Sequence, residues 1–412
     1  MIRGIKVKLY PNKEQEILFK KSCGLARYAY NWGLNYQKEN YKNGNKYIGK
    51  GDMKKLFKHF RDENEDVKWI FECSSEIPDQ AICDLDDAYK RFWKGITDFP
   101  RFKSKHKSEL SFYHSSNKIK VKDDMIYFEK IGWVKINDEN RLIRGVYKGK
   151  NKAENAKVYN PRIKYNGKYW YLAVAVEMND MKNEEKSDIR LGIDVGLKEL
   201  ATCSDTKVFD NINKSKKMKK LEKKLKKEQR KSSRQLLSNT DHYEKSKDKN
   251  GKDCLKPVWK KPLKECKNIQ KQNNKIRCIM NKLANIRLNH QHQVSNSIVK
   301  TKPKAIVVED LNIQGMLKNK HLSKQIHAVA WYRFMKFLEY KSEKYGIEFI
   351  KADRFYPSSK KCSKCGYIKK NLKLKDRIFK CSYCGNTIDR DLNASINLAN
   401  YVQKDKLEGC NI

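Results

Sequence analysis

The chain has 412 residues, of which 39% are hydrophobic, and its 92 Lys and Arg against 49 Asp and Glu give a formal net charge of +43. This length allows several domains with a buried core, and the charge indicates a polyanionic partner. Nucleic acid fits better than a membrane, because no segment approaches the roughly 18 apolar residues of a spanning helix. The N-terminus lacks the apolar segment of a signal peptide, which predicts a cytoplasmic protein with reduced cysteines.

The N-terminal half of the chain is predicted to contain a strand, then helices, then further strands. Ile5, Val7 and Leu9 alternate as in a strand, and Asn12 with Gln15 forms a capping-box pattern that predicts a helix start. Helical spacing continues to about residue 97, whereas residues 109–178 alternate with a period near two and predict a small β-barrel or sheet. The polar residues 179–188 are typical of a linker.

Residues 98–108 interleave aromatic and basic side chains. Candidate nucleic-acid contacts in this segment are Phe99, Arg101, Phe102 and Lys103. Aromatic rings can stack on bases and cations can neutralise phosphates, but an ordinary basic linker would look the same. The segment alone does not decide between the two.

Residues 213–235 are predicted to form a very basic helix, with 12 Lys or Arg against Glu222 and Glu228. A basic helix is usually a solvated face, yet this charge density favours an anionic neighbour. The candidate nucleic-acid contacts are Lys216, Lys217, Lys220 and Lys224. A second helix is expected from about residue 276, and residues 238–266 between the two are expected to be a loop.

Four of the 12 cysteines occur in two CxxC pairs, each followed by glycine. The predicted zinc ligands are Cys362, Cys365, Cys381 and Cys384. Four thiolates at this spacing suit a tetrahedral zinc ion with no open coordination position, so the zinc would be structural. The segment between the pairs is expected to be a short hairpin.

Three acidic positions follow one another in the second half of the chain. Asp194 ends an apolar strand, Glu309 ends another, and Asp391 begins a helix. Asp310 and Asp389 are neighbouring alternatives, and each acid alone could be a turn or cap residue. Their order is expected for an RNase H-like nuclease, in which three carboxylates hold two Mg²⁺ ions for phosphodiester hydrolysis.

Several motifs together resemble TnpB, a family of transposon-encoded RNA-guided DNA endonucleases related to compact type V CRISPR effectors. "GIDVGLKELAT", "IVVEDLNIQGM" and "DRDLNASINLA" are similar to the three RuvC motifs of the family. "RFYPSSKKCSKCG" and "KCSYCGNTIDRD" are similar to its zinc ribbon, and "YPNKEQEILFKKSCGLARYAYN" and "FPRFKSK" to its N-terminal half. The resemblance covers nearly the whole chain.

This resemblance implies a multidomain α+β and α/β protein. The implied domains are a wedge β-barrel (1–10 and 109–180), a helical recognition domain (11–108), a RuvC-like nuclease domain (186–356 and 386–412) and a zinc ribbon (357–385). It also implies a monomeric ribonucleoprotein that carries guide RNA from the transposon end. A single RuvC site would cut double-stranded target DNA beside a short target-adjacent motif, with Asp194, Glu309 and Asp391 as catalytic Mg²⁺ ligands and Asp391 favoured over Asp389.

Two other functions stay open. The chain could be a compact type V CRISPR effector, or an RNA-guided DNA-binding regulator without nuclease activity. The sequence departs from the family pattern at Ala328, where Asp is common, and at Ser395, where Ala is usual; neither is one of the three acids. Strand transfer belongs to a separate enzyme in these elements, so transposition by this chain is not expected.

Overall fold

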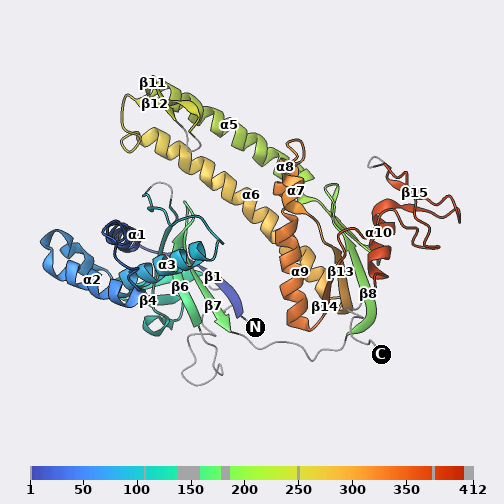
Figure 1. The fold of residues 1–412 in the computed structure, drawn as a ribbon, viewed down its shortest axis with the longest axis horizontal. Helices are drawn as coiled ribbons and strands as arrows, with labels where there is room; N and C mark the ends of the chain where they lie inside the picture. Colours follow the sequence, from blue (N-terminus) through green and yellow to red (C-terminus); the bar gives the residue numbers. More distant parts are fainter. Residues whose placement is uncertain are drawn as a thin grey trace. The chain divides into compact units, whose positions relative to one another are not determined.

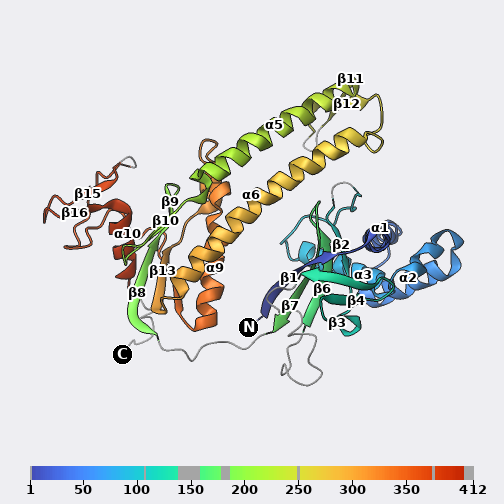
Figure 2. The same ribbon diagram turned by 180° about the vertical axis from the view of Figure 1, so that it is seen from behind.

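The computed structural model describes residues 2–105, 108–137, 158–177, 186–247, 251–373 and 376–402. It divides into two compact units, residues 1–179 and 180–412 (Figures 1 and 2). Most of the expected linker at 179–188 lies outside the described residues. No helix in the described part of the chain has the length and apolar character needed to cross a membrane.

The first unit contains a seven-stranded sheet. Its strand order is β2-β6-β7-β1-β5-β4-β3, and all of the strand pairs are antiparallel. The strands are β1 (Ile2–Tyr10), β2 (Leu110–Tyr113), β3 (Lys120–Lys122), β4 (Met125–Phe128), β5 (Gly132–Asn137), β6 (Val158–Tyr165) and β7 (Trp170–Glu177). The alternating segment after residue 109 is thus a sheet, which the N-terminal strand joins at its centre.

The helical segment of the first unit lies between β1 and β2 in the chain. It comprises α1 (Lys13–Lys42), α2 (Lys50–Glu63), the 3₁₀ helix η1 (Glu65–Glu72) and α3 (Glu76–Trp93), followed by a short 3₁₀ helix η2 (Ser116–Lys118) after β2. The capping box of Asn12 and Gln15 is present at the start of α1. Phe19 of α1 packs against Trp170, with ring centroids 4.9 Å apart, so α1 and the sheet share one core.

The second unit is built on a five-stranded sheet of order β10-β9-β8-β13-β14. The strands are β8 (Ser187–Asp194), β9 (Glu199–Cys203), β10 (Val208–Asp210), β13 (Pro303–Glu309) and β14 (Glu348–Ala352). β8, β13 and β14 run parallel, and β9 and β10 are antiparallel additions. The residues of β13 alternate between two cores, since Ala305 and Val307 pack with one cluster and Ile306 and Val308 with another.

Helices cover both faces of this sheet. The helices after β13 are α7 (Ile313–Leu317), α8 (Ser323–Val329), α9 (Trp331–Tyr345) and α10 (Arg390–Ala399). α9 and the C-terminal part of α6 (Lys267–Val299) pack on one face, and α10 packs on the other. Ala394 and Leu398 of α10 are buried, whereas Val402 lies beyond the end of the helix and is exposed.

A long helical pair extends from the sheet of the second unit. After the 3₁₀ helix η3 (Ile212–Lys214), α5 (Lys216–Ser238) lies alongside α6, and Met218, Ile279 and Leu283 form their small core (Figures 1 and 2). The second helix begins at Lys267, earlier than expected, because Ile269 and Gln272 are also buried.

The expected loop at 238–266 is largely ordered, so that prediction was wrong. Residues Thr240–Lys247 (β11) pair antiparallel with Asp253–Trp259 (β12), and this hairpin caps the far end of the helical pair. Its strands were missed because most of their residues are exposed and polar, so they show no alternation of apolar residues.

Candidate functional site

Asp194 and Glu309 lie at the ends of two adjacent strands. β8 and β13 are parallel, and Ile193 is the register partner of Val308, so the next residues are these two acids. Ile193 and Val308 belong to the core under α6 and α9. Because side chains alternate along a strand, both carboxylates face the opposite side of the sheet, which α10 covers.

Asp391 reaches the same place because α10 packs unusually closely on β8. A Cβ atom on Gly192 would lie 1.9 Å from the Ser395 carbonyl oxygen and 2.4 Å from the Ala399 nitrogen, so only glycine allows this approach. Gly192 and Asp194 share one face of β8, and Asp391 lies one helical turn before Ser395. The nearby Gly196 has a different contact, since its carbonyl accepts a hydrogen bond from Trp331 Nε1 (3.3 Å).

The three carboxyl groups influence one another electrostatically. Burial raises the pKa of Asp194 well above its usual value, and the negative charges of Glu309 and Asp391 raise the pKa further. Arg390 acts in the opposite direction. Carboxylates that repel one another in this way form a site for cations, and hard oxygen donors are the ligands that Mg²⁺ prefers.

The neighbouring acids are engaged in structural contacts. Asp389 is the N-cap of α10, and its Oδ1 accepts hydrogen bonds from the backbone N–H groups of Asp391 (2.9 Å) and Leu392 (3.1 Å). Asp310 pairs with Arg354 at 2.7 Å. Asp391 has a looser partner, with Arg390 Nε 3.9 Å from its Oδ1. Glu309 and Asp391 raise the pKa of Asp194 more than Asp389 does.

Ser358 is a residue of this site that the sequence analysis did not identify. Its hydroxyl donates a hydrogen bond to Glu309 Oε1 at 2.9 Å, and its carbonyl accepts one from Asn397 Nδ2 at 2.8 Å. Ser358 therefore links the strand acid to α10. Its only signal in the sequence is its place in "YPSSK", between the second acid and the first CxxC pair.

The four predicted cysteine ligands form a cluster. Their sulfur atoms all lie within 4.8 Å of one another, and this is the one compact set of three or more metal-ligating side chains found among the described residues. Cys362 Sγ lies 3.7 Å from Cys384 Sγ, and Cys365 Sγ lies 3.6 Å from Cys381 Sγ. The cluster could bind a metal such as zinc; the three carboxylates are more widely spread.

The pKa is lowered for Cys362 and Cys381 but raised for Cys365, where the backbone N–H of Tyr367 is outweighed by burial and the neighbouring thiols. Burial acts to raise the pKa of Cys362, but backbone N–H groups of Cys365 and Lys364 outweigh it and lower this pKa to about 6. Gly366 and Gly385 have φ values of 80° and 70°, which turn the chain after each CxxC pair. The expected hairpin between the pairs was wrong: β15 (Ile378–Lys380) pairs with β16 (Thr387–Asp389), so the hairpin encloses the second pair.

The cysteine cluster is fastened to α10 by buried amides. Asn393 Nδ2 and Asn397 Nδ2 donate to the Lys361 carbonyl at 2.7 and 2.6 Å, and Ser363 N donates to Asn393 Oδ1 at 2.9 Å. The helix that carries Asp391 is therefore held by the first cysteine knuckle. Two asparagines spaced i, i+4 among the apolar residues of this helix were the sequence signal for the contact.

The candidate nucleic-acid residues lie in different surroundings. On α5 the four candidate lysines are all exposed, and these are Lys216, Lys217, Lys220 and Lys224. In the first unit, Phe99 and Phe102 are half-exposed beside Lys38, and Arg101 pairs with Asp98 at 2.7 Å. Lys103 instead points inward, with Nζ 3.7 Å from the centre of the Tyr30 ring.

Three family models match parts of this chain. They are described as a Cas12f1-like TNB domain (residues 331–398), a helix-turn-helix domain of OrfB from IS605 elements (residues 1–46) and a probable transposase of the same OrfB group (residues 173–252). The structure shows a strand and one long helix over residues 2–42, rather than two helices joined by a turn.

Similar proteins extend the comparison to the whole chain. InsQ of Escherichia coli K12, named as a candidate RNA-guided DNA endonuclease, is 27% identical to this chain. The alignment covers 96% of this chain and 91% of InsQ. A TnpB-like protein of Acanthamoeba polyphaga mimivirus is 30% identical over 148 residues, which are 34% of this chain and 27% of that protein. The Cas12f1 chain of a Cas12f1–sgRNA–target DNA complex has the same fold, with a TM-score of 0.54 and 14% identity. The match covers 97% of this chain and 99% of the Cas12f1 chain.

The fold is shared with the compact Cas12f1 chain, and parts of the sequence match the Cas12f1-like and IS605 OrfB family models. The resemblance to the TnpB family that the motifs predicted is confirmed by these matches.

Proposed function

We propose that this protein is an RNA-guided DNA endonuclease whose single nuclease site consists of Asp194, Glu309 and Asp391. The observation that carries the proposal is the convergence of these carboxyl groups from β8, β13 and α10, segments far apart in the sequence. The relatives matched over most of the chain are named as enzymes of this class.

The donor set fits divalent Mg²⁺, and the three carboxylates would hold it. Bound Mg²⁺ supplies Lewis-acid activation and charge neutralisation for phosphodiester hydrolysis. The chain's own residues position these ligands: Ser358 orients Glu309 through its hydrogen bond, and Asp389 fixes the first turn of α10 at Asp391. Gly192 keeps that helix against the sheet, so the three acids are held on rigid elements.

The same proposal assigns the remaining parts of the chain. The five-stranded sheet with its helices corresponds to a RuvC-like domain (186–356 and 386–412), and the cysteine cluster to a zinc ribbon (357–385) with structural zinc. The seven-stranded sheet corresponds to the wedge (1–10 and 109–180), and the helices between its strands to the recognition domain (11–108).

The partners are a guide RNA and a double-stranded DNA target. Support comes from the net charge of +43, from the exposed lysines of α5 and from the names of the relatives. Guide pairing would supply sequence recognition, while the protein holds the heteroduplex by its shape and charge beside a short target-adjacent motif.

RNA guidance is tested by purifying the protein from cells that carry its native locus and sequencing the RNA that copurifies. We expect one dominant structured RNA that ends in sequence flanking the element. A repeat–spacer RNA would identify a CRISPR effector instead. Random cellular fragments would contradict RNA guidance, because they would show only unspecific binding by a basic surface.

A further inference from the structure

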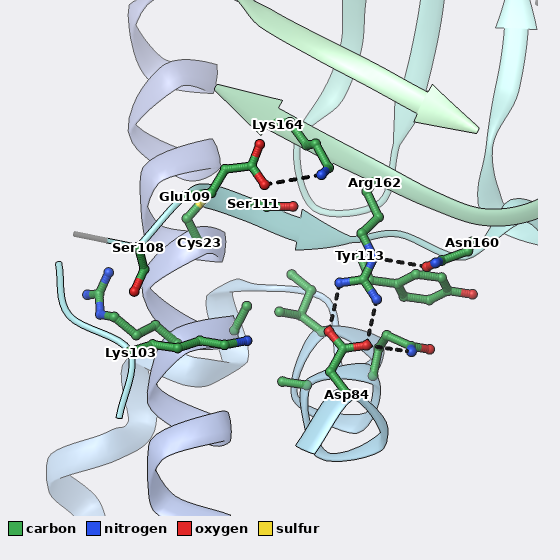
Figure 3. Close-up of a pocket in the computed structure, with 15 residues that line it drawn as sticks. Cys23, Asp84, Lys103, Ser108, Glu109, Ser111, Tyr113, Asn160, Arg162 and Lys164 are labelled. Atoms are coloured by element: carbon green, nitrogen blue, oxygen red, sulfur yellow. Dashed lines mark hydrogen bonds and ion pairs between the residues drawn. The ribbon is translucent and has the colours of Figure 1, made fainter. Parts of the chain in front are cut away.

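The first unit contains a polar cavity of about 450 Å³ that the nuclease chemistry does not use. Figure 3 shows side chains from α1, α3, β2 and β6 pointing into it, together with Lys103 and residues of the segment before β2. Its volume is within the range of pockets that bind small organic ligands. The cavity lies wholly within the first unit.

Two of the four cations around this cavity are already neutralised. Arg162 forms a forked pair with Asp84, at 2.7 and 2.6 Å, and Lys164 pairs with Glu109 at 3.1 Å (Figure 3). Asp84 and Glu109, the two acids in the described cavity lining, are therefore both paired with a cation.

The other two cations have no carboxylate partner in the part of the chain that the structure describes. Among the described residues, neither the guanidinium of Arg27 nor the Nζ of Lys103 forms an ion pair, and that Nζ lies over the face of Tyr30. Burial lowers the pKa of Lys103, and the positive charge of Arg162 lowers it further, although Asp84 acts against both. Among the described lining residues, the charges of Arg27 and Lys103 are therefore in excess over those of the two paired acids.

The cavity also offers an unused hydrogen-bonding group. Ser111 Oγ is buried and has no hydrogen-bond partner, which is costly unless a ligand or water satisfies it. The hydroxyl of Ser108 and the amide of Asn160 line the same space. Such groups suit the hydroxyls of a sugar or the polar edge of a base, and the cavity is larger than a lone phosphate needs.

We propose that this cavity binds one nucleotide, with its phosphate between Arg27 and Lys103 and its sugar or base beside Ser111. The nucleotide is either part of a bound nucleic-acid strand or a free mononucleotide, because both present the same phosphate and ribose chemistry. Charge-assisted bonds from guanidinium and ammonium groups would supply most of the affinity.

Two measurements distinguish these sources. The full-length protein, freed of nucleic acid at high salt, is titrated by calorimetry with inorganic phosphate and the four nucleoside 5′-monophosphates. The ribonucleoprotein as purified is crosslinked with ultraviolet light, and nucleotide-bearing peptides that contain Tyr113 are identified by mass spectrometry. Monophosphate binding indicates a free ligand, and a Tyr113 crosslink without monophosphate binding indicates a strand.

The variants Arg27→Gln and Lys103→Gln are expected to weaken monophosphate binding, or the crosslink yield, about tenfold or more. Lys105→Gln is the matched control, since Lys105 is exposed two residues away and loses the same charge. Thermal unfolding shows whether each variant is folded. The crosslink in the wild-type protein tests the proposal even if a variant does not fold. The proposal is overturned if the wild type shows neither signal, or if Lys105→Gln weakens the signal as much as folded Arg27→Gln and Lys103→Gln.

Discussion

At the scale of single residues, neighbouring acids have separate roles. Asp389 and Asp391 are two residues apart in one motif, yet the first caps α10 and the second faces Asp194. Glu309 and Asp310 divide in the same way, because Asp310 is paired with Arg354. Where carboxylates repel one another, their negative charge attracts a cation. A helix cap uses only the oxygen atom of the side chain, which accepts a hydrogen bond from the backbone.

This difference predicts unequal effects of the same substitution at the two positions. Asp391→Asn is expected to reduce DNA cleavage by more than the roughly 10–100-fold that loss of an outer-shell partner costs, because it removes a proposed metal-ligand charge. Asp389→Asn keeps the capping oxygen and is expected to retain cleavage within a few fold. Cleavage rates of the two ribonucleoproteins at saturating Mg²⁺ provide the measurement. Equal losses in both variants would contradict the assignment of Asp391.

At the scale of elements, the site depends on the contact between α10 and β8. Gly192→Ala would place a methyl group against backbone atoms of Ser395 and Ala399, which cannot rotate away. We expect a loss of about 3 kcal/mol or more in the unfolding free energy of the second unit, at the upper end of overpacking costs. Cleavage should fall as well, because Asp391 moves with the helix.

Chemical denaturation measures this loss, and Gly51→Ala is the control. Gly51 lies in α2 of the first unit, and nothing lies within 4 Å of the position of its Cβ. The control is expected to stabilise the protein by up to about 1 kcal/mol. An unchanged stability of Gly192→Ala would mean that α10 does not pack on β8 as described.

The cysteine cluster is a second element on which the site depends. Cys381→Ser is expected to abolish binding of one zinc per chain, measured by plasma mass spectrometry, since four thiolates form the donor set. It should also reduce cleavage, because the first knuckle holds Asn393 and Asn397 of α10. Cys266→Ser, outside the cluster, should change neither. Full zinc content in Cys381→Ser would contradict a four-thiolate site.

Elements were predictable where their residues are periodic or strongly patterned. The capping box at Asn12, the basic helix and the buried strand before Glu309 were all apparent from the sequence. The β11–β12 hairpin was not, because its exposed polar strands have no apolar face. The role of Gly192 was also not apparent, since a close approach depends on a helix about 200 residues away.

At the scale of the whole molecule, the net charge of +43 implies strong electrostatic binding to nucleic acid. Replacing Lys216, Lys217, Lys220 and Lys224 by Gln is expected to reduce the slope of log affinity against log salt by about three units, since each phosphate contact contributes roughly 0.7–0.9. Fluorescence anisotropy with the copurified RNA measures the slope. Replacement by Arg, which keeps the charge, should preserve it, and an unchanged slope in the Gln variant would exclude these lysines.

The most direct test of the central claim is a cleavage assay with the purified ribonucleoprotein and Mg²⁺. The substrate is a plasmid library with a guide-matched target beside randomised flanking sequence, and a mismatched target is the control. We predict cleavage of matched plasmids that share one flanking motif, and its loss in Asp194→Ala with target binding retained. Cleavage by Asp194→Ala equal to the wild type, or no cleavage by a wild-type complex that binds the matched target, would contradict the proposed nuclease site.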